Sequence, residues 1–201
     1  RNLKAPLYTR AALRRKGTVR YCIDTPYISE TLALAYDTLW PFLGEDVELV
    51  QRAAALGVPV TEPSDVRLLV EEMLASLLQC ALDGGAASNL PRVSQGVLVL
   101  LRALDRDDGQ DVLDWLYDAG PDRLGVFGIN NFFPDGVPPE ATGGYNSIHI
   151  AGLFDLETQL SGLRQLHPQA YPESRYPSLL SDPRAVRVAA APHELAMVGR
   201  A

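Results

Sequence analysis

The apolar residues of this 201-residue chain recur mostly every three or four positions, the spacing that places them on one face of an α-helix. The clearest run follows the polar stretch 61–65 and ends at Asp83-Gly84-Gly85. Pro63 suits the first turn of a helix, and paired glycines suit its end. The run predicts a long helix whose buried face is formed by Val66, Leu69, Val70, Met73, Leu74, Leu77 and Leu78.

Other segments show the same spacing between residues that start or stop a helix. Ser29 and Pro91 mark starts, whereas Pro41, Gly57 and Gly120-Pro121 mark ends. No segment alternates apolar and polar residues convincingly, as a half-buried strand would. We therefore predict helices over 29–41, 45–56, 91–104, 112–117, 145–166 and 182–190, with loops or turns over 125–139 and 171–177.

This series of helices joined by short loops predicts an all-α fold. Helix pairs in antiparallel succession fit either a helical bundle or part of an α/α toroid, and periodicity alone does not distinguish the two. With 47% hydrophobic and 21% charged residues, the chain is expected to form one well-buried domain. We divide it into a lead-in segment, 1–28, and a helical domain, 29–201.

The charge balance narrows the range of partners. The formal net charge is −7, whereas a general nucleic-acid binder needs a surplus of Lys and Arg. A basic cluster between Arg10 and Arg20 is typical of a solvated segment. No run approaches the ~18 apolar residues of a transmembrane helix. We therefore expect neither nucleic acid nor a membrane as a partner, and the sequence does not indicate a compartment.

Candidate chemistry is concentrated in residues 134–149, a turn-rich stretch that leads into an apolar helical pattern. Tyr145 and His149 are four residues apart, so a helix places the phenol and the imidazole on one face. Thr142 suits the cap of that helix, and Glu140 lies in the loop just before it. The first turn of a helix favours an ionised phenol, which can act as a base. The alternatives are a core tyrosine, a core histidine and a glutamate that caps the helix.

Three asparagines and one aspartate are weaker candidates for contact with a ligand. Asn89 lies between two predicted helices, where it either binds a substrate carboxylate or forms a turn. Asn130, Asn131 and Asp135 are candidate substrate-binding residues in the loop 125–139, with an ordinary loop role as the alternative. No metal or other cofactor is expected, because no carboxylate or cysteine stands at ligand spacing from His149, His167 and His193.

The residues Asp135-Gly136, Glu140 and Gly144-Tyr145-Asn146 resemble the DG…E…GYN signature of the heparinase II/III-like and alginate-lyase-like polysaccharide lyases. The resemblance covers roughly Tyr27 to the C-terminus. It implies an α/α toroid whose inner helices line a substrate groove, followed by a β-sandwich domain that would lie beyond this chain. Because the chain begins with Arg1 rather than Met, we expect a piece of a longer protein that alone is weakly active or inactive.

The same resemblance implies a reaction, the cleavage of a uronic-acid-containing polymer by β-elimination. In that reaction the proton α to the uronate carboxylate is removed and the 4-linked oxygen leaves. Asn89, together with Glu140, would neutralise the carboxylate or bind the sugar. Tyr145 would act as base and acid, and His149 would act as a base or tune Tyr145. The expected partners are an anionic polysaccharide or oligosaccharide and the C-terminal domain of the same protein.

Two alternatives to a lyase remain open from the sequence. A glycoside hydrolase on a similar toroid would need two opposed carboxylates, and Glu140 with Asp135 is the pair that the sequence offers. A non-catalytic helical module that binds carbohydrate is the other alternative. The lyase interpretation further predicts that the Asn89 loop and the start of the Tyr145 helix face one shared concavity.

Overall fold

The computed structural model describes residues 25–86, 88–139 and 143–188. These residues form helices and turns, and no strand occurs among them, so the all-α prediction is confirmed. A further helical segment covers 183–188. The α-helices are α2 (Thr25–Leu43), α3 (Val47–Ala55), α4 (Pro63–Leu82), α5 (Arg92–Leu104), α6 (Gly109–Asp118), α7 (Phe127–Asn131) and α8 (Gly143–Leu166), and the 3-10 helices are η2 (Leu124–Val126) and η3 (Leu179–Ser181).

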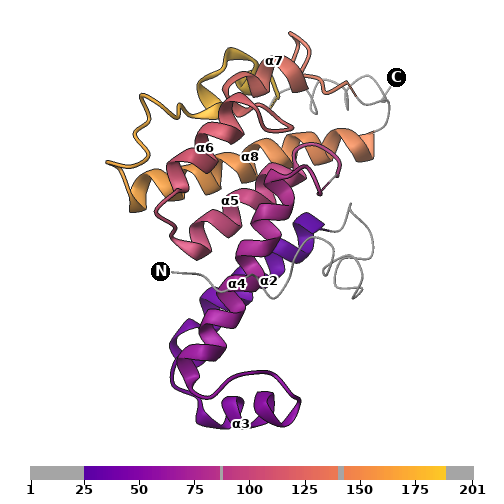
Figure 1. Cartoon of the computed structure of the whole chain (residues 1–201). Coiled ribbons are helices and arrows are strands. Elements are labelled where there is room, and N and C mark those ends of the chain that lie inside the picture. The colour runs from indigo at the N-terminus through magenta and orange to yellow at the C-terminus, as the bar shows by residue number, and fades with distance from the viewer. Residues whose placement is uncertain (1–24, 87, 140–142, 189–201) are drawn as a thin grey trace.

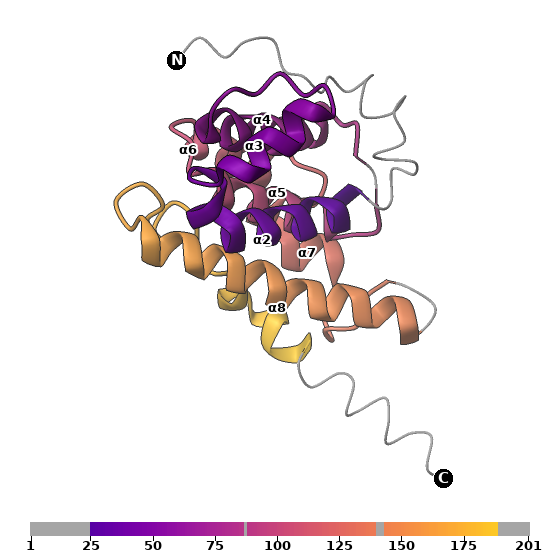
Figure 2. The same ribbon diagram turned by 90° about the horizontal axis from the view of Figure 1, so that it is seen from below.

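Helix α5 forms the centre of the fold and packs against α2, α4, α6 and α8 (Figure 1). Its segment Val97–Leu101 is apolar at every position and buried at every position. A helix that is apolar all round is stable only when other elements cover it on all sides. The surrounding helices meet this requirement, and Figure 2 shows α8 along the side of the molecule opposite α3 and α4.

Helix α4 begins where the sequence predicts. Pro63 is the first helical residue, and Glu62 and Asp65 form a reciprocal capping box with the first backbone amides. Asp65 Oδ2 also accepts hydrogen bonds from the backbone N–H of Thr61 at 2.7 Å and from its hydroxyl at 2.8 Å. These acceptors satisfy amides that a helix start otherwise leaves without partners.

The first predicted helix continues past its expected end at Pro41, because α2 reaches Leu43. Contacts made by the last turn explain the difference. The Trp40 ring packs against Tyr36 at a centroid distance of 5.3 Å, and the Arg67 guanidinium lies 4.0 Å from the Trp40 ring. Leu43 is buried in the core. Proline removes only one backbone bond, and these packing contacts keep the final turn helical.

The predicted loop 125–139 is wrong over its first part, because η2 and α7 occupy residues 124–131. Phe127 and Phe132 are buried, and their rings pack edge to face at 6.0 Å. Tertiary burial of these aromatic residues therefore stabilises a short helix that local propensity did not indicate. The predicted last helix, 182–190, is helical over 183–188, and its remaining residues lie outside those described.

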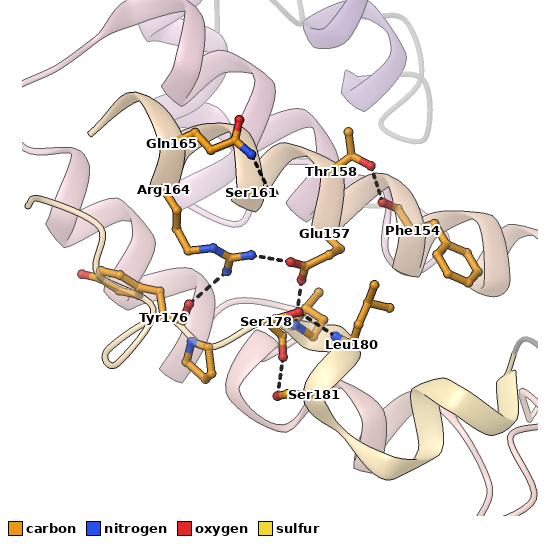
Figure 3. A network of polar contacts seen from close by, with 12 residues as sticks. Phe154, Glu157, Thr158, Ser161, Arg164, Gln165, Tyr176, Ser178, Leu180 and Ser181 are labelled. Carbon is orange, nitrogen blue, oxygen red and sulfur yellow. Dashed lines mark hydrogen bonds and ion pairs between the residues drawn. The ribbon is translucent and has the colours of Figure 1, made fainter. Parts of the chain in front are cut away.

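The segment after α8 is held against the helix by a buried ion pair between Glu157 and Arg164 (Figure 3). Glu157 Oε2 accepts the backbone N–H of Leu179 at 2.7 Å, and Arg164 Nη1 donates to the backbone carbonyl of Tyr176 at 3.0 Å. The Tyr176 hydroxyl then donates to Asp114 on α6 at 2.7 Å. The segment therefore links α8 to α6.

Breaking this ion pair tests that link. Glu157→Gln should lower the free energy of unfolding by about 3 kcal/mol, because the Arg164 guanidinium would stay buried without a compensating charge. The side chains of Arg164 and Glu157 are only 13% and 12% exposed. The exposed pair Glu48–Arg52 is the control, and Glu48→Gln should change stability by less than about 0.5 kcal/mol. Urea unfolding of both variants measures the difference, and equal losses would contradict the structural account.

Close contact between α8 and the turn before α5 depends on Gly152. A Cβ atom at this position would lie 2.4 Å from Cδ of Pro91, which is far inside van der Waals contact. Gly144, on the same helix, has no atom within 4 Å of an added Cβ. Gly144 and Gly152, although both lie on α8, therefore have different physical requirements.

We expect Gly152→Ala to destabilise the protein by ~1–3 kcal/mol, the usual effect of overpacking. Gly144→Ala should be neutral or slightly stabilising, because alanine is the better helix former. Thermal and urea unfolding of the two variants provides the measurement. A Gly152→Ala protein as stable as Gly144→Ala would show that α8 and the Pro91 turn do not pack as closely as described.

Candidate functional site

A pocket of about 250 Å³ lies where α2, α5 and α8 meet, and we call it the α5–α8 pocket. Helix α8 contributes residues at successive turns, and their spacing places them on one helix face. The other walls come from the starts of α2 and α5. Its lining residues are Glu30, Arg92, Gln95, Ser147, Ile148, Ala151, Gly152 and Asp155.

The pocket is polar and carries both signs of charge. Gln95 Nε2 donates a hydrogen bond to Asp155 Oδ2 at 3.1 Å, which joins α5 to α8 across the site. Arg92 supplies a guanidinium, the group best shaped to bind a carboxylate through two parallel hydrogen bonds. Glu30 and Asp155 supply carboxylates, which accept hydrogen bonds from hydroxyl groups. This arrangement suits a hydroxylated ligand that carries a carboxylate.

Tyr145 and His149 lie on α8, one turn apart, just before and within the stretch that lines the pocket. Their environments differ, because the Tyr145 side chain is 49% exposed and the His149 side chain is only 5% exposed. A ligand can therefore reach the phenol, whereas the imidazole lies behind the surface. Neither residue is among those that line the α5–α8 pocket.

Asn89 lies in the turn that leads into α5, where its carbonyl oxygen accepts the backbone N–H of Arg92 at 3.0 Å. It therefore adjoins the pocket through Arg92 without lining it. The pocket is lined by Arg92, close in sequence to Asn89, and by Ser147, close in sequence to Tyr145, but by neither candidate itself. That Asn89 and Tyr145 face one shared concavity stays a prediction. Glu140 and the expected cap residue Thr142 lie outside the described residues.

The candidates on the 125–139 segment occupy different environments. Asn130 is exposed on α7, whereas Asn131 is 1% exposed and donates through Nδ2 to the Phe127 carbonyl at 3.1 Å. Asp135 is exposed, and its Oδ1 accepts the backbone N–H of Val137 at 3.0 Å, which is a local turn contact. The structure brings none of these three residues into the α5–α8 pocket.

A buried carboxylate, Asp122, lies behind the first turn of α5. Its Oδ2 accepts a hydrogen bond from the Ser94 hydroxyl, and its side chain is 2% exposed. Burial raises the pKa of the Asp122 carboxyl, and hydrogen bonds from Ser94 partly oppose that rise. The ionised side chain is therefore held in an environment that disfavours its charge.

A second cavity of about 460 Å³ lies between α8 and the segment that follows it. The Glu157–Arg164 pair forms part of its wall, but both side chains bind backbone groups of residues 176–179. Glu157 and Arg164 therefore support the chain that follows α8. Within the described ranges, no group of three or more His, Cys, Asp and Glu side chains is placed to hold a metal ion.

Sequence reasoning missed the charged residues of the pocket, Glu30, Arg92 and Asp155, as well as Asp122. They come from separate elements, so spacing along the chain does not reveal that they meet. One signal was present, because Ala151-Gly152 interrupts the larger apolar residues of the predicted helix and marks a close approach.

Comparisons with known proteins identify no relative of this chain. No family model, curated protein or solved structure matches the chain. None of the helices in the described part of the chain combines the length and the apolar character needed to cross a membrane.

The raised pKa of Asp122 predicts a pH dependence of stability. The folded protein binds the Asp122 proton more tightly than the unfolded chain does. The protonated carboxyl therefore contributes fully to stability below the pKa of the unfolded chain, roughly 3.9, and this contribution is lost as the pH rises through the pKa of the folded protein. Asp122→Asn removes this titration. We therefore expect the stability of the wild type relative to Asp122→Asn to rise as the pH falls from neutral. Urea unfolding of both proteins across that range measures it, and a constant or opposite difference would contradict the burial of the charge.

Proposed function

We propose that this chain forms part of the site of a polysaccharide lyase, which cleaves a uronic-acid-containing polymer by β-elimination. The observation that carries the proposal is the solvent-reachable Tyr145 at the start of α8, next to a polar pocket that contains Arg92. The all-α fold is compatible with part of an α/α toroid, which we propose as the architecture of the whole domain.

β-Elimination needs three chemical contributions. The uronate carboxylate must be neutralised so that the α-proton becomes acidic, a base must remove that proton, and an acid must protonate the leaving oxygen. We assign the first task to Arg92, whose guanidinium can pair with the carboxylate, with Asn89 and Glu140 as further proposed contacts. Arg92 follows the Asn89 turn directly, so one segment would carry both groups.

We assign the proton transfers to Tyr145. Its phenolate would take the α-proton, and the resulting phenol would donate a proton to the 4-linked oxygen as that bond breaks. Its place in the first turn of α8 exposes it to the positive end of the helix dipole. His149 is buried, so we assign it an indirect role in which it tunes Tyr145 without touching the substrate.

The overall charge favours recognition of a short stretch of polymer. Residues 25–188 contain 23 Asp and Glu but only 10 Lys and Arg. Such a surface repels a long polyanion, and the repulsion is screened within about 10 Å at ordinary ionic strength. Recognition would then depend on local pairing of one uronate with Arg92.

A glycoside hydrolase is the second candidate, and one specific observation favours it. Glu30 and Asp155 line the α5–α8 pocket from two different helices, as a pair of catalytic carboxylates would. This pair replaces the Glu140–Asp135 pair suggested by the sequence, because Asp135 is engaged in a local turn. A non-catalytic carbohydrate-binding module would bind sugar in the same pocket without turnover.

The decisive measurement follows the products that the protein forms from pectate, alginate and glycosaminoglycan substrates. A lyase releases an unsaturated uronate that absorbs ultraviolet light, whereas a hydrolase releases only saturated reducing ends. Tyr145→Phe should lower turnover by ~10²–10⁴ while stability changes little. Tyr117→Phe is the matched control, because it also loses a phenolic hydroxyl, one that donates to the Pro177 carbonyl at 2.8 Å. Near wild-type release of the unsaturated product by Tyr145→Phe would remove Tyr145 from the mechanism.

A further inference from the structure

The first turn of α5 is fixed from behind by a buried contact between distant parts of the chain. The Ser94 hydroxyl donates to Asp122, which lies 28 positions further on, between α6 and η2. Ser94 is 0% exposed, so both partners are sealed from solvent. A charge-assisted hydrogen bond in such surroundings is strong and directional.

The same turn presents two other residues to the α5–α8 pocket. Arg92 and Gln95 are three positions apart, so they share one side of the helix, and both line the pocket. Ser94 lies between them in sequence and points to the other side, into the core. Gln95 also binds Asp155 of α8. A rotation of this turn would therefore move both polar groups of the α5 wall together.

At the start of helix α5 the Arg92 N–H is bound by the Asn89 carbonyl, and the amides that follow it need another acceptor. Its N-cap residue is Pro91, and no side chain at the cap accepts a hydrogen bond from the first turn. The first amides of a helix otherwise lack partners, and a negative charge near them is stabilised by the helix dipole. Asp122 supplies that charge from a separate loop, where it accepts hydrogen bonds from the hydroxyl and the backbone of Ser94 in this turn.

A buried carboxylate such as Asp122 stabilises a helix start less than a neutral capping residue does, because its charge loses contact with water. Its Oδ1 atom is buried and has no hydrogen-bond partner among the described residues. A neutral serine or asparagine at the cap position would cap the first turn without burying a charge. The buried carboxylate therefore lowers stability relative to such a cap, which leaves its presence behind this turn to be explained.

We propose that Asp122 is a positioning residue of the α5–α8 pocket, where it fixes the first turn of α5 through Ser94 and so sets the positions of Arg92 and Gln95. The identity of the ligand, a sugar that carries a carboxylate, rests on the proposed function. The positioning itself rests on the contacts of Ser94 and Asp122.

The test compares Asp122→Asn and Ser94→Ala with Glu157→Gln, whose largely buried carboxylate binds Arg164 and the Leu179 amide and so supports the segment after α8. All proteins are studied at a temperature where each is fully folded. With the uronate polymer that gives turnover, we expect KM to rise about tenfold or more in Asp122→Asn and Ser94→Ala, and kcat to fall as well, because Arg92 both binds the carboxylate and makes the α-proton acidic. Glu157→Gln should keep the wild-type KM. The double variant should be no worse than the more affected single variant, because both changes remove one interaction.

Hydrogen exchange of the ligand-free proteins gives a second readout that needs no substrate. Asp122→Asn and Ser94→Ala should speed exchange selectively in the first turn of α5, whereas Glu157→Gln should speed it in residues 176–181. If Asp122→Asn fails to fold, the positioning role is tested with Ser94→Ala, because that change removes only a hydroxyl group.

The possible results distinguish a failure of the positioning role of Asp122 from a failure of the proposed lyase function. An active protein whose KM changes equally in Asp122→Asn and Glu157→Gln, or not at all in Asp122→Asn and Ser94→Ala, would overturn the positioning role. A wild-type protein that neither binds nor cleaves any uronate polymer would contradict the proposed function. The positioning role of Asp122 would then be tested by hydrogen exchange alone. Selective loosening of the α5 turn would support the positioning role, and unchanged or uniform exchange would reject it.

Discussion

The burial of the middle of α5 on all sides is the constraint on which the rest of the structure depends. Its middle, Val97–Leu101, is apolar at every position, so α2, α4, α6 and α8 must each turn a face toward it. Polar side chains on such a helix are tolerated only where the packing opens or where a buried partner receives them. Both conditions occur at its first turn, where Arg92 and Gln95 reach the pocket and Ser94 reaches Asp122.

The arrangement of helices follows from the sequence where apolar spacing and end signals agree. Helix α4 starts at Pro63 and α8 ends at Leu166, close to the predicted bounds, because each combines a long apolar stripe with a clear end signal. The failures have a common physical cause. Contacts from distant residues keep the last turn of α2 beyond Pro41 and stabilise α7 around Phe127, and local propensity contains no information about such contacts.

The candidate site was predictable only as far as its residues are neighbours in sequence. Tyr145 and His149 were found because one helix carries both, but their exposure depends on what packs against α8 and could not be inferred from spacing. Glu30, Arg92 and Asp155 belong to three helices and meet only in the folded chain. Asn131 has the polar side chain of a binding residue, yet the fold buries it against the Phe127 carbonyl.

Glu157 and Asp122, two carboxylates with little exposure, differ in how fully their oxygens are bonded. Glu157 has both oxygens engaged, one by Arg164 and one by the Leu179 amide, so its charge is compensated and its role ends with the chain segment that it holds. Asp122 has one engaged oxygen and one without a partner among the described residues. Incomplete satisfaction of a buried charge lowers stability, and proteins accept such losses mainly where they hold a site in place. Asp122 lies directly behind the turn that presents Arg92, so the stability lost by burying its charge would be linked to the correct placement of Arg92 in the pocket.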